Sequence, residues 1–202
     1  MIRLVAVFLM VGAGALQAEV EGMMFPALHA VVGVAETDVL NIRAAPDPEA
    51  EVVGTLAPNQ MGVEVIRVTE GWAEVNTGEA KGFAALRFLE REEGPDWYAL
   101  ARPLACFGTE PFWSLNLDPD ASTATFTTPD MTEPRTDPIG QTWPGTLWAP
   151  RAAIDLPDGL AVLSPGDCSD GMSEQSYGIA VDLFLRTGDR QRLSGCCTLT
   201  LR

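Results

Sequence analysis

The four cysteines of this chain all lie in its C-terminal half, at Cys106, Cys168, Cys196 and Cys197, and the last two are adjacent. An even number of cysteines in an exported chain indicates disulfides, and four cysteines allow three pairings. Each bridge would restrict the unfolded chain and so stabilise the fold. We therefore expect the C-terminal half to be held together by disulfides.

Residues 1–18 have the composition of a secretory signal peptide. Arg3 is followed by an apolar run over residues 4–10 and by small residues that end at Ala18, the usual order of charged region, apolar region and cleavage site. The apolar run is short for a bilayer span, and an uncleaved anchor is the alternative. We expect a periplasmic or secreted mature protein without stable membrane insertion.

The chain is strongly acidic. It carries 13 Lys and Arg against 28 Asp and Glu, a formal net charge of −15, and loss of the signal peptide with Arg3 would make this charge −16. A chain of this kind lacks the basic footprint that neutralises nucleic-acid phosphates, so we expect no nucleic-acid partner. The charge would attract basic partners, although acidity also serves solubility alone.

Short alternating apolar segments, separated by Gly and Pro, run from residue 31 to residue 91. Such a series predicts a small β-barrel or sandwich. Residues 61–68 within it alternate, with Met61, Val63 and Val65 on one face and Glu64, Ile66 and Val68 on the other, which predicts one strand. In the C-terminal half, residues 177–185 and 192–201 predict an antiparallel hairpin around a turn at 187–189, whereas the proline-rich stretch 129–145 predicts mostly loop.

No long helical period appears in the chain, so we expect a mainly β protein. The charged residues 90–96, with Gly94 and Pro95 among them, mark a domain boundary. We expect four segments: a signal peptide (1–18), a first domain (30–91), a linker (92–104) and a cysteine-containing antiparallel β domain (105–202).

Four short elements of the N-terminal half resemble the bacterial SH3-like domain. They are Leu-Asn-Ile-Arg at 40–43 with Pro46 after it, Val-Gly-Thr-Leu at 53–56, Gly-Trp at 71–72 and Lys-Gly-Phe at 81–83. The family usually has tryptophan where Phe83 stands. The resemblance implies a small SH3-like β-barrel that binds cell-wall or peptide ligands, with Leu40 and Ile42 in its core. Trp72 and Phe83 are the candidate ligand-binding residues.

Three motifs of the C-terminal half resemble a poorly characterised family of bacterial envelope proteins. They are Gly-Thr-Glu-Pro-Phe-Trp at 108–113, Cys-Ser-Asp-Gly-Met-Ser at 168–173 and Gly-Cys-Cys at 195–197. The activity of that family is not established, so the resemblance implies an envelope location and no mechanism. The aromatic residues of the first motif either seal the end of a β-core or line a cleft, which makes Trp113 the third candidate ligand-binding residue.

The adjacent cysteines point to opposite faces of the last strand, because side chains alternate along a strand. Cys197 lies on the apolar face of that strand and Cys196 on its polar face. Since Cys106 precedes a core strand and Cys168 lies in a polar loop, we favour the disulfides Cys168–Cys196 and Cys106–Cys197. The swapped pairing and a vicinal bridge are the alternatives. No Cys-x-x-Cys redox motif is present, and a zinc cluster would need reduced thiols.

The sequence offers little for catalysis. His29 is the only histidine and lies in no motif. Asp167, Asp170 and Glu110 lack the spacing of a calcium loop, and the aspartates are typical of turns. We expect no catalytic residue, no metal and no cofactor. We favour an exported non-catalytic envelope protein that binds peptidoglycan or a peptide; the alternatives are an acidic inhibitor of a basic secreted enzyme such as lysozyme and, less favoured, an enzyme that uses the acidic loop.

Overall fold

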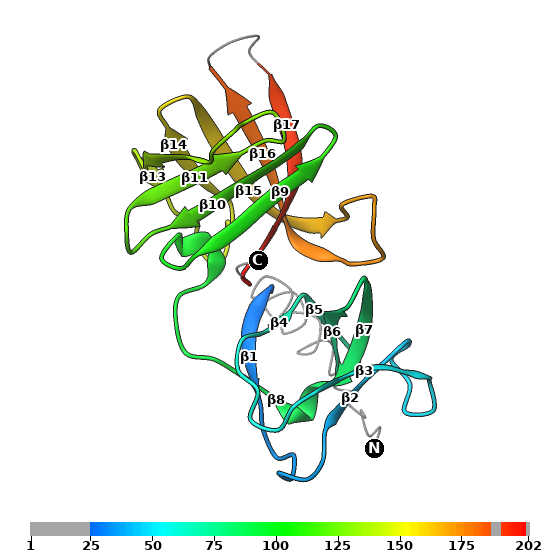
Figure 1. The fold of residues 1–202 in the computed structure, drawn as a ribbon. Helices are drawn as coiled ribbons and strands as arrows, with labels where there is room; N and C mark the ends of the chain where they lie inside the picture. Colours follow the sequence, from blue (N-terminus) through cyan, green and yellow to red (C-terminus); the bar gives the residue numbers. More distant parts are fainter. Residues whose placement is uncertain (1–24, 187–190, 201–202) are drawn as a thin grey trace, which may run out of the picture.

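The computed structural model describes residues 25–186 and 191–200, which form a mainly β protein (Figure 1). The expected signal peptide and the expected turn at 187–189 lie outside the described residues. Three antiparallel sheets of three, five and nine strands make up the described part. The two smaller sheets come from residues 27–91, and the nine-stranded sheet comes from residues 104–198.

Residues 27–91 form their two sheets around one apolar core. The sheet orders are β4-β1-β8 and β3-β2-β7-β6-β5. Leu40 and Ile42 lie in this core, and they are 5% and 1% exposed. The elements are β1 (Ala27–Val31), β2 (Leu40–Arg43), β3 (Val52–Leu56), β4 (Val63–Val65), β5 (Arg67–Thr69), β6 (Trp72–Thr77), β7 (Ala80–Ala85), the 3-10 helix η1 (Leu86–Phe88) and β8 (Leu89–Arg91).

Two features of this part differ from the sequence prediction. The pattern places no strand before residue 31, yet β1 begins at Ala27 and pairs with both β4 and β8. The single strand predicted over 61–68 is two strands in different sheets, with a break at Ile66, which is 3% exposed. Met61, predicted on the same face as Val63 and Val65, is 66% exposed, whereas these valines are 5% and 0% exposed.

The nine-stranded sheet has the order β12-β11-β10-β9-β17-β16-β15-β14-β13. The proline-rich stretch predicted as loop supplies both of its edge strands, β12 and β13. Both are short, and the proline of β12 is tolerated because an edge strand needs hydrogen bonds on one side only. The elements are the 3-10 helix η2 (Trp97–Ala99), β9 (Leu104–Thr109), β10 (Phe112–Asp118), β11 (Thr123–Thr127), β12 (Arg135–Pro138), β13 (Thr142–Trp143), β14 (Ala152–Leu156), β15 (Gly159–Cys168), β16 (Tyr177–Leu185) and β17 (Arg192–Thr198).

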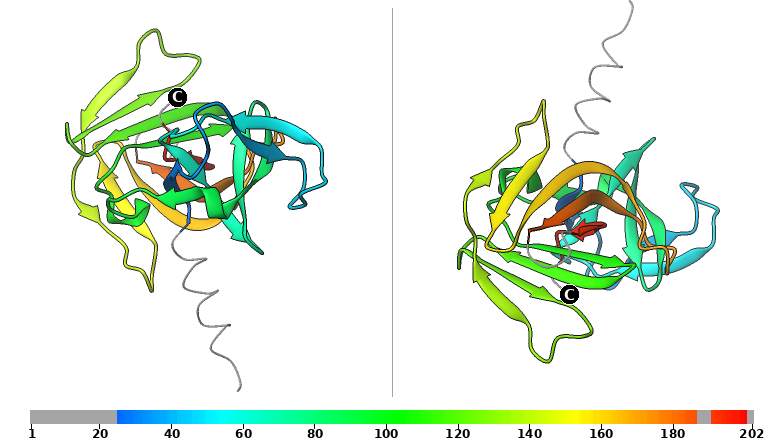
Figure 2. Two further views of the ribbon diagram at one scale, coloured as in Figure 1. Left: turned by 90° about the horizontal axis from the view of Figure 1, so that it is seen from below. Right: turned by 90° about the horizontal axis from the view of Figure 1, so that it is seen from above.

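This sheet curves until its two edges approach each other. Figure 2 shows its strands wrapped around one interior, which is filled by a single cluster of buried apolar side chains. The edge strands β12 and β13 are consecutive in the chain, so residues 139–141 connect the two edges. An ion pair of 2.5 Å between Arg135 Nη1 and Asp158 Oδ2 joins β12 to the turn between β14 and β15.

The predicted linker, residues 92–104, contributes to this interior. Trp97 and Tyr98 of η2 are 1% and 4% exposed and belong to the core of the nine-stranded sheet. Burial of Tyr98, together with its hydroxyl hydrogen bond to the Asp96 carboxylate, raises the pKa of Tyr98 to about 12. The segment between the sheets is therefore anchored by its aromatic residues.

Backbone pairing joins the N-terminal sheets to the C-terminal half. The chain after β15 passes beside the start of β7 (Figure 1), where Glu174 forms a parallel bridge with Ala80. The Glu174 N–H donates to Glu79 O at 2.9 Å, and the Lys81 N–H donates to Glu174 O at 3.2 Å. Because β2 pairs with β7 only near Phe83, this end of β7 has a free edge, and the segment extends it as an added strand would.

Two polar side chains reinforce this contact. The Asn76 amide donates to Ser176 O at 2.8 Å and accepts from the Ser176 N–H at 3.1 Å. The Glu64 carboxylate accepts from the Leu199 N–H at 3.0 Å and from the Thr198 hydroxyl. Thr198 is consequently 2% exposed although it points away from the interior of the nine-stranded sheet.

Candidate functional site

Trp72 owes its position to a tight turn between β5 and β6. Thr69 pairs with Trp72, so only Glu70 and Gly71 form the loop. Both have positive φ, 50° and 84°, as the two central residues of a type I′ hairpin turn require. The turn places Trp72 at the first position of β6, where its ring is half-buried.

Trp72 lines a surface groove of about 990 Å³, hereafter the Trp72 groove. The apolar part of the lining includes Val39, which is 43% exposed. The charged part has both signs, from Arg43, Asp38, Glu70 and Arg87. The groove thus combines an aromatic surface with positive and negative groups, which is the combination that a peptide with charged side chains requires. Its remaining lining consists of Gly33, Val34, Ala35, Leu40, Asn41, Pro48, Gly71, Ala85, Leu86 and Phe88.

Phe83 lies outside the lining of the Trp72 groove. It is directly opposite Arg43 of β2 and Glu74 of β6, and Glu74 is opposite Arg67 of β5. Residues that face each other across antiparallel strands share a face, so these four form one row across the five-stranded sheet. Trp72 occupies the next row of the same face. The structure places the two candidates near each other without bringing them into one groove.

Sequence reasoning missed the buried carboxylate of this row. Glu74 is 5% exposed, with its Oε2 3.1 Å from Arg67 Nε and its Oε1 3.8 Å from Lys81 Nζ. Arg67 continues outward to Asp167, with 2.5 Å between Nη1 and Oδ1. Alternation along β6 puts Glu74 on the same face as Trp72 and Asn76, and that is the only signal the sequence carries. These charges link the five-stranded sheet to the C-terminal half.

Trp113 is a core residue in this structure. It is 4% exposed, and its ring packs where a Cβ on Gly108 would lie 2.3 Å from Nε1 and one on Gly195 would lie 3.0 Å from Cζ2. Its indole Nε1 has no hydrogen-bond partner among the described residues. It borders a hollow of about 590 Å³, but the exposed aromatic of the motif is its neighbour Phe112, at 51%.

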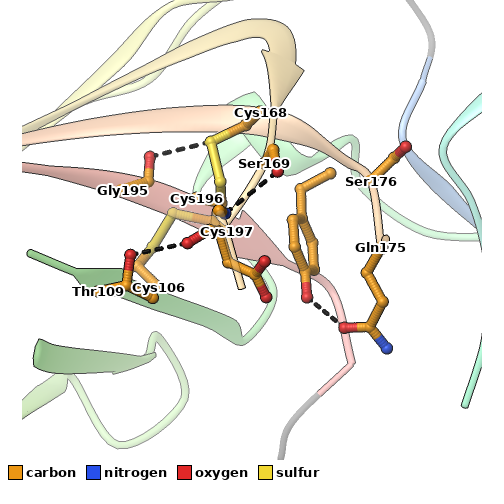
Figure 3. The surroundings of a disulfide bond; sticks show 12 residues. Cys106, Thr109, Cys168, Ser169, Gln175, Ser176, Gly195, Cys196 and Cys197 are labelled. Atoms are coloured by element: carbon orange, nitrogen blue, oxygen red, sulfur yellow. Dashed lines mark hydrogen bonds between the residues drawn. A yellow bond between two sulfur atoms is a disulfide. The ribbon is translucent and has the colours of Figure 1, made fainter. Parts of the chain in front are cut away.

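The four cysteines form two disulfides, Cys106–Cys197 and Cys168–Cys196 (Figure 3). Cys197 faces the interior of the nine-stranded sheet, where it pairs across to Cys106 of β9. Cys196 points to the outer face, yet it is only 1% exposed. The end of β15 lies beside it, with Cys168 bonded to Cys196 and Cys168 Sγ 3.3 Å from Gly195 O. The inner bridge therefore joins β17 to β9, and the outer bridge joins β17 to the end of β15.

The acidic loop is organised as a turn. Asp170 Oδ1 accepts hydrogen bonds from the backbone N–H groups of Met172 at 3.0 Å and Ser173 at 2.9 Å. Thr109 Oγ1 donates to Asp170 O at 2.7 Å, which ties the turn to β9. Asp167 is instead paired with Arg67. Within residues 25–186 and 191–200, no group of His, Cys, Asp and Glu side chains is arranged to hold a metal ion.

His29 lies inside β1 and is 4% exposed. Burial is the main cause that lowers the pKa of His29, and the nearby Arg91 lowers it further. Two effects oppose this shift: the hydrogen-bond contact of 3.0 Å between Nδ1 and Ala27 O, and the negative charge of Glu92. The ring stacks on Phe25 with a centroid distance of 5.9 Å. His29 is thus a packing residue of the small sheet.

No helix in the described part of the chain has the length and hydrophobicity that crossing a bilayer requires. The disulfides are consistent with a location outside the cytoplasm, where such bonds persist.

Comparison with known proteins identifies one part of the chain. No curated protein and no solved structure matches it significantly. Residues 38–90, which span β2 to β8 and contain Trp72 and its hairpin turn, match the family model described as "Bacterial SH3 domain". The N-terminal sheets therefore include an SH3-like domain of the bacterial type, a class of binding module.

Proposed function

We propose that this chain is an exported, non-catalytic envelope protein that binds a peptide, such as the peptide part of the cell wall, through the Trp72 groove. The half-buried Trp72, placed by its hairpin turn in a groove of about 990 Å³ on an SH3-like domain, carries the proposal. Tryptophan suits this role because its ring offers a large apolar surface at small entropic cost. The mixed charges of Arg43 and Glu70 match the carboxylates and amines of a cell-wall peptide.

The contact between the two halves supports the choice of groove. Segment 174–176 already occupies the free edge of β7, so an external peptide cannot add to the sheet there. The Trp72 groove contains none of the residues that make this contact. It is therefore available in the intact chain.

Binding of purified peptidoglycan and of its isolated stem peptide to the purified protein tests the proposal. Trp72→Ala should weaken stem-peptide binding by roughly 30-fold, the effect of losing an interfacial hot spot of about 2 kcal/mol. Trp148→Ala is the matched control, because Trp148 is 72% exposed and lies in the other half. Equal binding by wild type and Trp72→Ala, with both variants folded, would exclude the Trp72 groove.

The net charge of −15 favours one second candidate, an inhibitor of a basic secreted enzyme such as lysozyme. Inhibition of lysozyme by the purified protein, with a potency that falls as salt is raised, would support this function over cell-wall binding. If lysozyme keeps its full activity in low salt with micromolar concentrations of this protein present, the inhibitor function is rejected.

A further inference from the structure

Two large apolar side chains lie exposed where separate segments of the C-terminal half meet. Phe112 is 51% exposed and Met172 is 70% exposed. They border two adjoining hollows of about 810 and 590 Å³, which we call together the Phe112 groove. Both hollows share the lining residues Phe107, Gly108, Thr109, Phe112, Asp170 and Met172.

Phe112 lies on the outward face of its strand. Along β10 the buried positions are Trp113, Leu115 and Leu117, and the outward positions after Phe112 are Ser114, Asn116 and Asp118. Phe112 is therefore an apolar residue on a face that is otherwise polar. It adds nothing to the interior, and adjoining exposed apolar side chains at a hollow are a feature of interaction sites.

The turn that carries Met172 is anchored by two bonds on its N-terminal side. Cys168 is tied to β17 by its disulfide, and Asp170 is tied to β9 through Thr109. The Asp170 carboxylate accepts from the Met172 N–H itself, and Gly171 adopts the positive φ of 69° that the turn requires. A fixed turn loses little entropy on binding, whereas the flexible thioether adapts to the shape of a partner. The segment thus presents one adaptable side chain on a rigid base.

The charge of the groove is negative. Glu110, Asp170 and Asp182 line the larger hollow, and its described lining includes no lysine or arginine. Asp182 accepts from Ser194 Oγ at 2.7 Å and lies 3.8 Å from Arg192 Nε, so its charge is partly balanced. Asp170 accepts hydrogen bonds from the backbone N–H groups of its own turn, while Glu110 is exposed. The whole chain carries −15, so a second copy or an anionic surface would be repelled.

We propose that the Phe112 groove binds an extended segment of a partner protein in which a basic side chain stands next to a large apolar one. The apolar side chain packs between Phe112 and Met172, and the basic side chain lies beside Glu110. This site is separate from the Trp72 groove, with which it shares no lining residue.

A fluorescently labelled 12-residue peptide of alternating Lys and Leu is the probe, and anisotropy measures its dissociation constant with the full-length processed protein. We expect the double variant Phe112→Ser/Met172→Ser to weaken binding at least tenfold. The matched control Trp148→Ser/Phe184→Ser removes two other exposed apolar side chains, which are 72% and 42% exposed, and should bind like wild type. Phe112→Leu/Met172→Leu should retain most of the affinity, which separates loss of contact from loss of fold.

Charge is tested in the same assay. Glu110→Gln should weaken binding of the Lys/Leu peptide about threefold and reduce the dependence of binding on salt. With the wild-type protein, a Lys/Ser peptide and a Glu/Leu peptide should each bind at least tenfold more weakly than the Lys/Leu peptide. Trp72→Ala should leave this binding unchanged, so failure of the proposed cell-wall function does not affect the result. The inference is overturned if the serine double variant binds like wild type, if the control variant loses as much affinity, if the Lys/Ser peptide binds as tightly, or if sedimentation shows a second copy of the chain on the groove.

Discussion

Removing the Cys106–Cys197 disulfide should cost more stability than removing the Cys168–Cys196 disulfide. The first bridge spans a sequence separation of 91 residues and the second a separation of 28. In the chain-entropy model, closing loops of these lengths in the unfolded chain stabilises the fold by about 4.6 and about 3.6 kcal/mol at 25 °C, respectively. Loop length alone therefore predicts a difference of about 1 kcal/mol.

Packing increases this difference. Cys106 and Cys197 are 1% and 0% exposed inside the core of the nine-stranded sheet, whereas Cys168 is only half-buried. Replacing the inner pair by alanine leaves a cavity among close-packed side chains, and its cost adds to the entropic one. A whole domain is stable by only about 5–15 kcal/mol, so the inner double variant should be close to unfolding at 37 °C.

Urea unfolding without reductant, followed by tryptophan fluorescence, measures both losses. The two double alanine variants and wild type are compared at equal m-values, so that the midpoints report stability. Hydrogen exchange supplies an independent readout, because loss of the outer bridge should raise exchange in segment 168–176 while the interior strands stay protected. An equal or larger loss in the outer variant, or losses below about 1 kcal/mol in both, would refute the reasoning.

Three further changes test other parts of the fold. Asn76→Ala removes the two hydrogen bonds that Asn76 makes to Ser176 across the interface between the halves and should cost about 2 kcal/mol in urea unfolding, since the buried backbone groups of Ser176 lose their partners; unchanged stability would contradict this contact. Burial lowers the pKa of His29, so the unfolded chain binds the proton more tightly, and wild type should lose stability as the pH falls below 6.5. Melting temperatures between pH 7.5 and pH 5 should fall less steeply in His29→Gln, and parallel slopes would argue against a neutral buried ring. Gly195→Ala should destabilise by roughly 1–3 kcal/mol or more, because its Cβ would lie 2.0 Å from Phe107 O, while Gly166→Ala, with nothing within 4 Å, should be neutral; similar melting temperatures for the two variants would be the contrary result.

The β class was predictable because apolar alternation is local. The sequence places Trp113, Leu115 and Leu117 on one strand face, and the structure buries that face. The exposure of Phe112 was not predicted, because the sequence left the aromatic residues of its motif either sealing the core or lining a cleft. The two faces of Cys196 and Cys197 are also local information, and the structure pairs these residues with Cys168 and Cys106.

The remaining features depend on contacts that leave no local pattern. β1 is a five-residue strand outside the matched SH3 residues, and it exists because β4 and β8 provide partners on both sides. Cys196 is buried beside Cys168, which the sequence places in a polar loop and the structure places at the end of β15. Glu74 is buried because Arg67 and Lys81 from neighbouring strands surround it, which requires knowledge of the sheet order.

The docking of Glu174 on β7 uses backbone atoms on both sides. Its side chain can therefore be exchanged for any residue other than proline, which lacks the N–H, without losing this pairing. Length is different, because the Cys168–Cys196 bridge fixes one end of the segment and the pairing at Ala80 fixes the other. One residue gained or lost between these points would place the opposite backbone face against β7, so deletions and insertions there should separate the two halves where substitutions do not.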